Sequence, residues 1–256
     1  MYGAILGDII GSIYEFKNIK STDFPLISHE ARFTDDSVLT VATAYALLYD
    51  KDYAETYRKF GRIYPNRGYG GRFKDWLSKD DAPAYNSFGN GSAMRVSPVA
   101  YCHNNLDDVL TEAERSAEAT HNHPEGIKGA QSVAAAVYMA RTGVIKSDIK
   151  RYICDNFSYD LSFSLSDIRQ SYEFNETCQG SVPQAIVAFL ESASYEDAVR
   201  KAVSIGGDSD TIACIAGSIA EAYYGGLPLD LIRYAESKLD YYMTDIIRRF
   251  KTKYKF

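Results

Sequence analysis

Two short acidic clusters stand far apart in the sequence, and each comes directly before an apolar run with helical spacing. The clusters read Thr34-Asp35-Asp36-Ser37 and Asp208-Ser209-Asp210-Thr211. An acid before a helix often only caps free backbone N–H groups, which explains one acid in each cluster. Further carboxylates packed beside it are unfavourable unless a cation compensates their charge. Because carboxylate and hydroxyl oxygens suit Mg²⁺, Mn²⁺ or Ca²⁺, the clusters predict a two-metal site.

The first segment, residues 3–15, carries glycines at positions 3, 7 and 11. We predict a helix here, because glycines four residues apart share one helical face and let a neighbouring backbone approach closely. Asp8, Ser12 and Glu15 would share another face, so an otherwise apolar helix would direct two carboxylates the same way. That face is either a solvent-facing stripe or a buried polar surface.

Residues 87–95 contain a glycine-rich turn that leads into a predicted helix, and Arg95 is the last residue of this segment. Such a turn can present backbone N–H groups to a phosphate, although by itself it reads as a plain turn. The turn is not a P-loop, and Met94 stands where a dinucleotide fingerprint has its third glycine.

Two of the four histidines, His121 and His123, fall at a predicted break between helices. No third nitrogen or sulfur ligand accompanies them, so capping, packing and substrate contact stay open while a transition-metal site is discounted. Tyr69 lies in another glycine loop and could stack on a base, but the chain has 21 tyrosines and most must be structural.

The elements that must position these residues are predicted to be helices. Apolar residues recur at three- and four-residue steps in residues 38–48, 106–119, 126–140, 182–190, 195–203 and 232–250. Turn residues gather in residues 65–71, 82–91 and 204–208. Because no strand–helix alternation is present, we predict an all-α fold. The 256 residues show no internal break, so we expect a single domain over residues 1–256.

Charge and cysteine usage restrict the partners and the compartment. The formal charge is −6 and the basic residues are spread thinly, apart from a basic final turn at residues 248–253, so nucleic acid is not an expected partner. The four scattered cysteines suggest no zinc site or disulfide framework. Without a basic leader or about 18 uninterrupted apolar residues, we expect a cytoplasmic protein with no membrane partner, monomeric by default.

Five motifs in a fixed order resemble those of the ADP-ribosylglycohydrolase family, which includes dinitrogenase-reductase-activating glycohydrolase. They are Gly3-Ala4-Ile5-Leu6-Gly7-Asp8, Thr34-Asp35-Asp36-Ser37, Gly89-Asn90-Gly91-Ser92-Ala93-Met94-Arg95, Thr120-His121 and Gly206-Gly207-Asp208-Ser209-Asp210-Thr211. The resemblance rests on the order of the motifs rather than on any one of them. It implies a compact orthogonal helical bundle with two Mg²⁺ or Mn²⁺ ions at the bottom of a cleft that accepts ADP-ribose.

The resemblance also implies roles for individual residues. The family's metal ligands match Thr34, Asp35, Asp36, Asp208, Asp210 and Thr211. Glu15 matches the carboxylate near the scissile bond, and we expect Glu15, or Asp36 in its place, to act as general base or charge stabiliser. The candidate substrate-binding residues are Asp8, Tyr69, Gly89, Asn90, Gly91, Ser92, Ala93, Met94 and His121. Asp8 has three open roles: contact with a metal-bound water, a hydrogen bond to ribose, or support of a neighbouring helix end.

The implied activity is hydrolysis of the bond between the anomeric carbon of ADP-ribose and a modified protein side chain. Arginine is the expected linkage, and the alternative is serine-linked, other O-linked or nucleic-acid-linked ADP-ribose. A non-catalytic ADP-ribose-binding relative and a two-metal phosphodiesterase or phosphatase are further alternatives. We expect a water activated by the ions to be the nucleophile. Residues 17–32 and 157–180 are expected to contact the modified partner.

Overall fold

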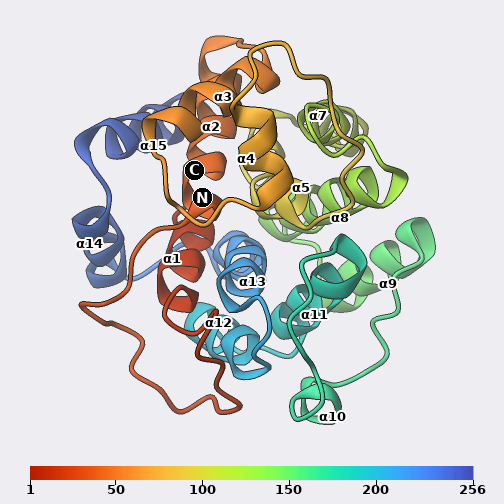
Figure 1. Cartoon of the computed structure of the whole chain (residues 1–256). Helices are drawn as coiled ribbons and strands as arrows, with labels where there is room; N and C mark the ends of the chain where they lie inside the picture. The colour runs from red at the N-terminus through yellow and green to blue at the C-terminus, as the bar shows by residue number, and fades with distance from the viewer. Residues whose placement is uncertain (256) are drawn as a thin grey trace.

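The computed structural model describes residues 1–255, and the regular elements of that range are all helices (Figure 1). In chain order they are α1 (Tyr2–Gly11), α2 (Asp35–Tyr49), α3 (Tyr53–Ile63), α4 (Gly71–Leu77), α5 (Gly91–Met94), α6 (Val99–Cys102), α7 (Leu106–Glu118), α8 (Pro124–Arg141), α9 (Lys146–Phe157), α10 (Leu165–Ile168), α11 (Cys178–Leu190), α12 (Tyr195–Ser204), α13 (Ser209–Tyr224), α14 (Leu229–Lys238) and α15 (Tyr241–Tyr254). Within residues 1–255 no strand forms, and one isolated bridge joins Gly89 to Thr177. The all-α prediction is confirmed. The predicted domain ends at Phe256, which lies outside the described residues.

Most predicted helices form where the apolar spacing places them. The stripes at residues 38–48, 106–119, 126–140, 182–190 and 195–203 correspond to α2, α7, α8, α11 and α12. The stripe at residues 232–250 is an exception, because it is divided between α14 and α15. Leu239 is extended, and the Asp240 side chain accepts a hydrogen bond from the Met243 N–H at 2.8 Å, which caps a new helix.

Helix α1 packs along α13 at the centre of the molecule, where the red and blue ribbons run side by side (Figure 1). A Cβ atom at Gly3 or Gly7 would overlap the backbone carbonyl of Gly217 or Ala213, and one at Gly11 would overlap the start of α13. The predicted close approach along the glycine face is therefore confirmed. It sets the first residues of the chain against the helix that follows the second acidic cluster.

The first helix is shorter than predicted. It ends at Gly11, and the next residue, Ser12, donates its hydroxyl to the Ile9 carbonyl at 2.8 Å and accepts from the Arg32 N–H at 3.1 Å. Glu15 therefore lies in the loop after α1, and the prediction that it shares a helical face with Asp8 is wrong. Separately, no helix in residues 1–255 has the length and apolar character needed to cross a membrane.

Candidate metal centre and ligand cleft

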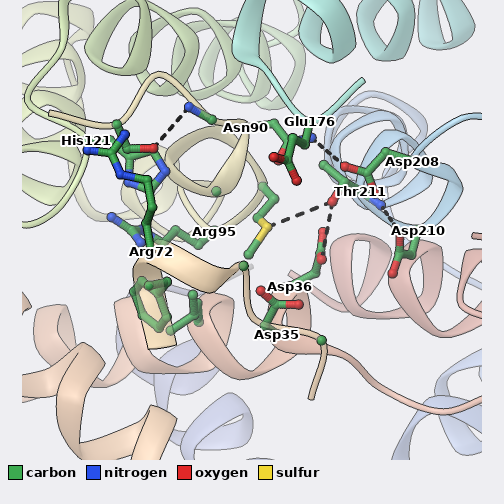
Figure 2. Close-up of a pocket in the computed structure, with 18 of the residues that line it drawn as sticks. Asp35, Asp36, Arg72, Asn90, Arg95, His121, Glu176, Asp208, Asp210 and Thr211 are labelled. Carbon is green, nitrogen blue, oxygen red and sulfur yellow. Dashed lines mark hydrogen bonds between the residues drawn. The ribbon is translucent and has the colours of Figure 1, made fainter. Parts of the chain in front are cut away.

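A cleft of about 350 Å³ opens where the N-terminal ends of α2 and α13 meet the short helix α5. This volume falls within the roughly 300–1,000 Å³ range of small-molecule sites. Its walls come from segments that are far apart in sequence (Figure 2). The predicted site residues that line it are Glu15, Asp35, Asp36, Gly89, Asn90, Gly91, Met94, His121, Asp208, Asp210 and Thr211.

Carboxylates converge at one end of the cleft, which we call the acidic end. Oxygen atoms of Asp8, Asp36 and Asp210 lie within 4.8 Å of one another, and the same holds for Glu15, Asp208 and Asp210. Because both groups contain Asp210, they are neighbours. Figure 2 shows Asp35, Asp36, Asp208 and Asp210 on one side of the cleft, with His121 and Arg72 on the other.

In the metal-free protein, burial and mutual repulsion disfavour the ionised forms of the carboxylates at the acidic end. Burial, followed by the charges of neighbouring acids, raises the pKa of Asp36 and the pKa of Asp210 above the ordinary range. Burial also raises the pKa of Asp208 to about 6. The pKa of Glu15 is raised to about 8, mainly by burial and then by the charge of Asp210. A bound cation would reverse these shifts, because it favours the ionised forms.

The side chains at the acidic end fit a hard divalent cation. Oδ2 of Asp36 accepts from the hydroxyl of Thr211 at 3.4 Å, whereas its buried Oδ1 has no hydrogen-bond partner in residues 1–255. A buried carboxylate oxygen without a partner is costly, and a metal ion would satisfy it. Both groups offer only carboxylate oxygens, the donors that Mg²⁺ and Mn²⁺ prefer.

Asp8 supports the site from behind. Its carboxylate accepts from the Thr34 N–H at 3.0 Å, the Thr34 hydroxyl at 2.6 Å, the Ser37 N–H at 3.1 Å and the Ser37 hydroxyl. Asp8 is fully buried and does not line the cleft, so a direct hydrogen bond to ribose does not fit its placement. Support of a neighbouring helix end, one of the three open roles, matches these contacts at the start of α2.

The turn at residues 89–94 reaches the cleft only in part. Ser92 and Ala93 are fully buried, and the Ser92 hydroxyl donates to a backbone carbonyl of α8, so neither residue is placed to touch a ligand. Asn90 lines the cleft and donates from Nδ2 to Oδ2 of Asp208 at 2.7 Å. The turn is therefore tied directly to the second acidic cluster.

Tyr69 does not occupy the place predicted for it. Its ring stacks on Phe73 with centroids 5.4 Å apart, and its hydroxyl donates to the Tyr64 carbonyl at 3.0 Å. The side chain is buried and does not line the cleft, so it is not placed to stack on a base as predicted. Tyr69 instead packs behind the wall of the cleft. Tyr85 and Phe174 are aromatic residues that do line the cleft.

The two predicted histidines have different positions. His123 caps α8, since its Nδ1 accepts from the Glu125 N–H at 3.1 Å, while His121 lines the cleft. Lining residues that were not named as site residues include Arg72, Tyr85, Arg95, Phe174 and Glu176. The two arginines flank the glycine-rich segments, and Phe174 and Glu176 belong to residues 157–180, which were expected to contact the modified partner.

A sequence model of the ADP-ribosylglycohydrolase family matches residues 1–254. The chain belongs to the ADP-ribosylglycohydrolase family. ADP-ribosylhydrolase ARH3 of Gallus gallus is 28% identical to this family member over 306 residues, covering 87% of this chain and 83% of the relative. ADP-ribosylarginine hydrolase Tri1 of Pseudomonas putida is 28% identical over 152 residues, covering 55% of this chain and 40% of the relative.

The fold of this ADP-ribosylglycohydrolase has a solved counterpart. A structure described as an ADP-ribosylglycohydrolase-related protein complex superposes with a TM-score of 0.72 and 22% identity, covering 97% of this chain and 95% of the other. The predicted fold class and the resemblance are therefore confirmed. Membership of the family makes the chain a glycosyl hydrolase.

Proposed function

We propose that this ADP-ribosylglycohydrolase hydrolyses the bond between the anomeric carbon of ADP-ribose and a modified arginine side chain, using two Mg²⁺ or Mn²⁺ ions. The observation that carries the proposal is that two clusters of three carboxylates, which share Asp210, meet at one end of the cleft. Similarity to an ADP-ribosylhydrolase over most of the chain supports it. Similarity to an ADP-ribosylarginine hydrolase over about half of the chain supports the linkage.

The residues that would hold the ions are Thr34, Asp35, Asp36, Asp208, Asp210 and Thr211. When bound, such ions polarise oxygen atoms and make water a nucleophile at neutral pH. The hydroxyl of Thr211 orients the Asp36 carboxylate, which leaves Oδ1 of Asp36 for a cation. Asn90 orients Asp208 in the same way.

We assign proton transfer at the scissile bond to Glu15, with Asp36 as the alternative. Glu15 lines the cleft beside Asp208 and Asp210, so it can reach a group bound at the acidic end. A carboxylate at this place can take up a proton from water and release it to the leaving group. Water adds to the anomeric carbon, the carbon–nitrogen bond breaks, and the proton from water passes to the arginine nitrogen.

The opposite end of the cleft suits the diphosphate. Arg72 lies there with His121 and supplies positive charge, across from the carboxylates (Figure 2). ADP-ribose would then place its terminal ribose at the acidic end and its diphosphate beside the turn at residues 89–91. Tyr85 and Phe174 offer aromatic surface for the adenine.

The charge of the acidic end favours a cationic leaving group. Six acidic side chains surround it: Asp8, Glu15, Asp35, Asp36, Asp208 and Asp210. Two divalent ions carry four positive charges, so an excess of negative charge remains when these acids are ionised. An arginine-linked ADP-ribose retains a cationic guanidinium, whereas a serine-linked conjugate presents a neutral oxygen. The excess charge therefore supports the arginine linkage.

Peptides carrying ADP-ribose on arginine or on serine test this proposal, with the products separated by chromatography. We expect free ADP-ribose, released at least about tenfold faster from the arginine peptide, which corresponds to about 1.4 kcal/mol. Faster release from the serine peptide would overturn the linkage. Formation of AMP would indicate attack at phosphorus, and binding of ADP-ribose without release from either peptide would indicate a binding protein.

A further inference from the structure

Arg95 is a fully buried cation in the wall of the cleft, with its guanidinium carbon 4.0 Å from the centre of the Tyr57 ring. Its Nη2 donates to the Ser116 carbonyl at 3.2 Å and to Oγ1 of Thr120 at 2.9 Å. A guanidinium has donors and no acceptor. The Thr120 oxygen must therefore accept the hydrogen bond from Arg95.

The Thr120 hydroxyl can then donate its own proton to one acceptor only among residues 1–255. Oγ1 of Thr120 lies 2.7 Å from Nδ1 of His121, and within residues 1–255 no other acceptor for this hydroxyl is found. Thr120 is fully buried, so water does not offer an alternative. The hydroxyl donates to Nδ1, which must then be unprotonated, and a neutral imidazole in that state carries its proton on Nε2.

A protonated imidazole does not fit the same surroundings. It would donate from Nδ1 to the Thr120 oxygen and leave the buried hydroxyl proton without an acceptor. Burial, and then the charges of Arg95 and Arg72, lower the pKa of His121. Tyr85 also faces this ring, with centroids 6.1 Å apart, and brings no negative charge to it.

The Nε2 side of His121 faces the cleft. A Cβ atom at Gly91 would lie 3.1 Å from Nε2 and one at Gly89 would lie 3.6 Å away, and both glycines line the cleft. Among residues 1–255, Nε2 has no protein hydrogen-bond partner. Its donor is therefore free for a bound molecule.

We propose that Arg95 and Thr120 are positioning residues that hold His121 as the neutral Nε2–H tautomer and aim one N–H donor at a ligand oxygen beside the turn at residues 89–91. The tautomer follows from the hydrogen-bond chain alone. The contact with a phosphate or ribose oxygen of ADP-ribose rests on the proposed function.

Long-range ¹H–¹⁵N correlation spectra of the full chain test the tautomer without any assay of activity. We expect unprotonated Nδ1 and protonated Nε2 for His121 at neutral pH, with the signals assigned by their loss in His121→Gln. Thr120→Ser keeps the hydroxyl and should keep this pattern, whereas Thr120→Val should populate both tautomers. Protonated Nδ1 in the wild type would overturn the proposal, and so would a folded Thr120→Val variant with an unchanged pattern. If Thr120→Val does not fold, the wild-type and Thr120→Ser spectra still decide.

Calorimetry with ADP-ribose as the probe separates this inference from the proposed function. Thr120→Val should weaken binding by up to about tenfold, the effect of one hydrogen bond, and Thr120→Ser should restore it. The predicted tautomer in a wild type that does not bind ADP-ribose would support the inference while rejecting the proposed function. Binding of ADP-ribose by a wild type whose His121 carries its proton on Nδ1 would reject the inference while remaining consistent with the proposed function.

Discussion

The side-chain amide of Asn18 pairs with both backbone groups of Gly207. Its Oδ1 accepts from the Gly207 N–H at 2.6 Å. The two hydrogens of Nδ2 are shared among the carbonyls of Tyr14 at 2.7 Å, Glu15 at 2.8 Å and Gly207 at 3.0 Å. Gly207 has a φ of +72°, a conformation that glycine adopts readily, and Asp208 follows it directly. Asn18 therefore ties the loop that carries Glu15 to the second acidic cluster.

Replacement of Asn18 by alanine should loosen Glu15 relative to Asp208. The lost hydrogen bonds are each worth about 1 kcal/mol, so we expect kcat to fall roughly tenfold while the helical content stays unchanged. Steady-state kinetics of Asn18→Ala test this. The matched control is Asn104→Ala, because Asn104 is also an exposed asparagine. Equal kcat values for the two variants would show that the Asn18 bridge does not position Glu15.

Glu15→Gln keeps the size of the side chain and removes its ability to ionise. If Glu15 transfers the proton, kcat should fall by roughly 10²–10⁴. The comparison is with Glu30→Gln, because Glu30 is an exposed residue of the same loop. A Glu15→Gln enzyme with at least half of the wild-type rate would remove Glu15 from the mechanism and favour Asp36.

The stability of the metal-free protein should decrease as pH rises from about 4 to about 8, with the Asp208 part of the decrease lying mainly between about 4 and 6. The pKa of Asp208 is about 6 and that of Glu15 about 8 in the folded chain, both above the ordinary values of about 4. The folded state therefore binds these protons more tightly than the unfolded state does, and this contribution is lost as the groups ionise.

Urea unfolding in EDTA at these pH values measures this effect. Addition of Mg²⁺ should make the decrease smaller, because the cation compensates the ionised carboxylates. Asp208→Asn should also reduce it, since one titrating group is gone. A metal-free protein that gains stability over this pH range, with the gain absent in Asp208→Asn, would contradict the electrostatic account of the acidic end.

Gly7→Ala tests the packing that brings the acidic groups together. The added Cβ would overlap the Ala213 carbonyl and push α1 away from α13. We expect a loss of about 1–3 kcal/mol in the free energy of unfolding, typical of overpacking, together with weaker Mg²⁺ binding. Gly71→Ala is the control, since its Cβ would meet no atom within 4 Å. Equal stability of the two variants would mean that the α1–α13 contact is not tight.

Local sequence features predicted much of this molecule. Three- and four-residue apolar spacing identified α7, α8, α11 and α12, and the glycines at positions 3, 7 and 11 predicted a close helix contact. The two acidic clusters were predicted to lie together, and Asp36 and Asp210 do. These features depend on residues within a few positions of one another, so a single sequence displays them.

The remainder depends on long-range contacts that no local pattern encodes. Tyr69 is kept out of the cleft by its packing on Phe73, and Ser12, directly after the end of α1, accepts a hydrogen bond from the backbone N–H of the distant Arg32. Phe174 and Glu176 come to the cleft on a loop without a motif. The Asn18 bridge joins residues 189 positions apart. Such contacts are visible only after folding.

Metal dependence of ADP-ribose release tests the central claim most directly. The substrate is an arginine-modified peptide, and the enzyme is treated with EDTA and then supplied with Mg²⁺ or Mn²⁺. The account predicts no release in EDTA, recovery with either ion for the wild type and for the exposed control Asp81→Asn, and no recovery for Asp208→Asn. Release of ADP-ribose at an undiminished rate in EDTA, or by Asp208→Asn, would contradict it.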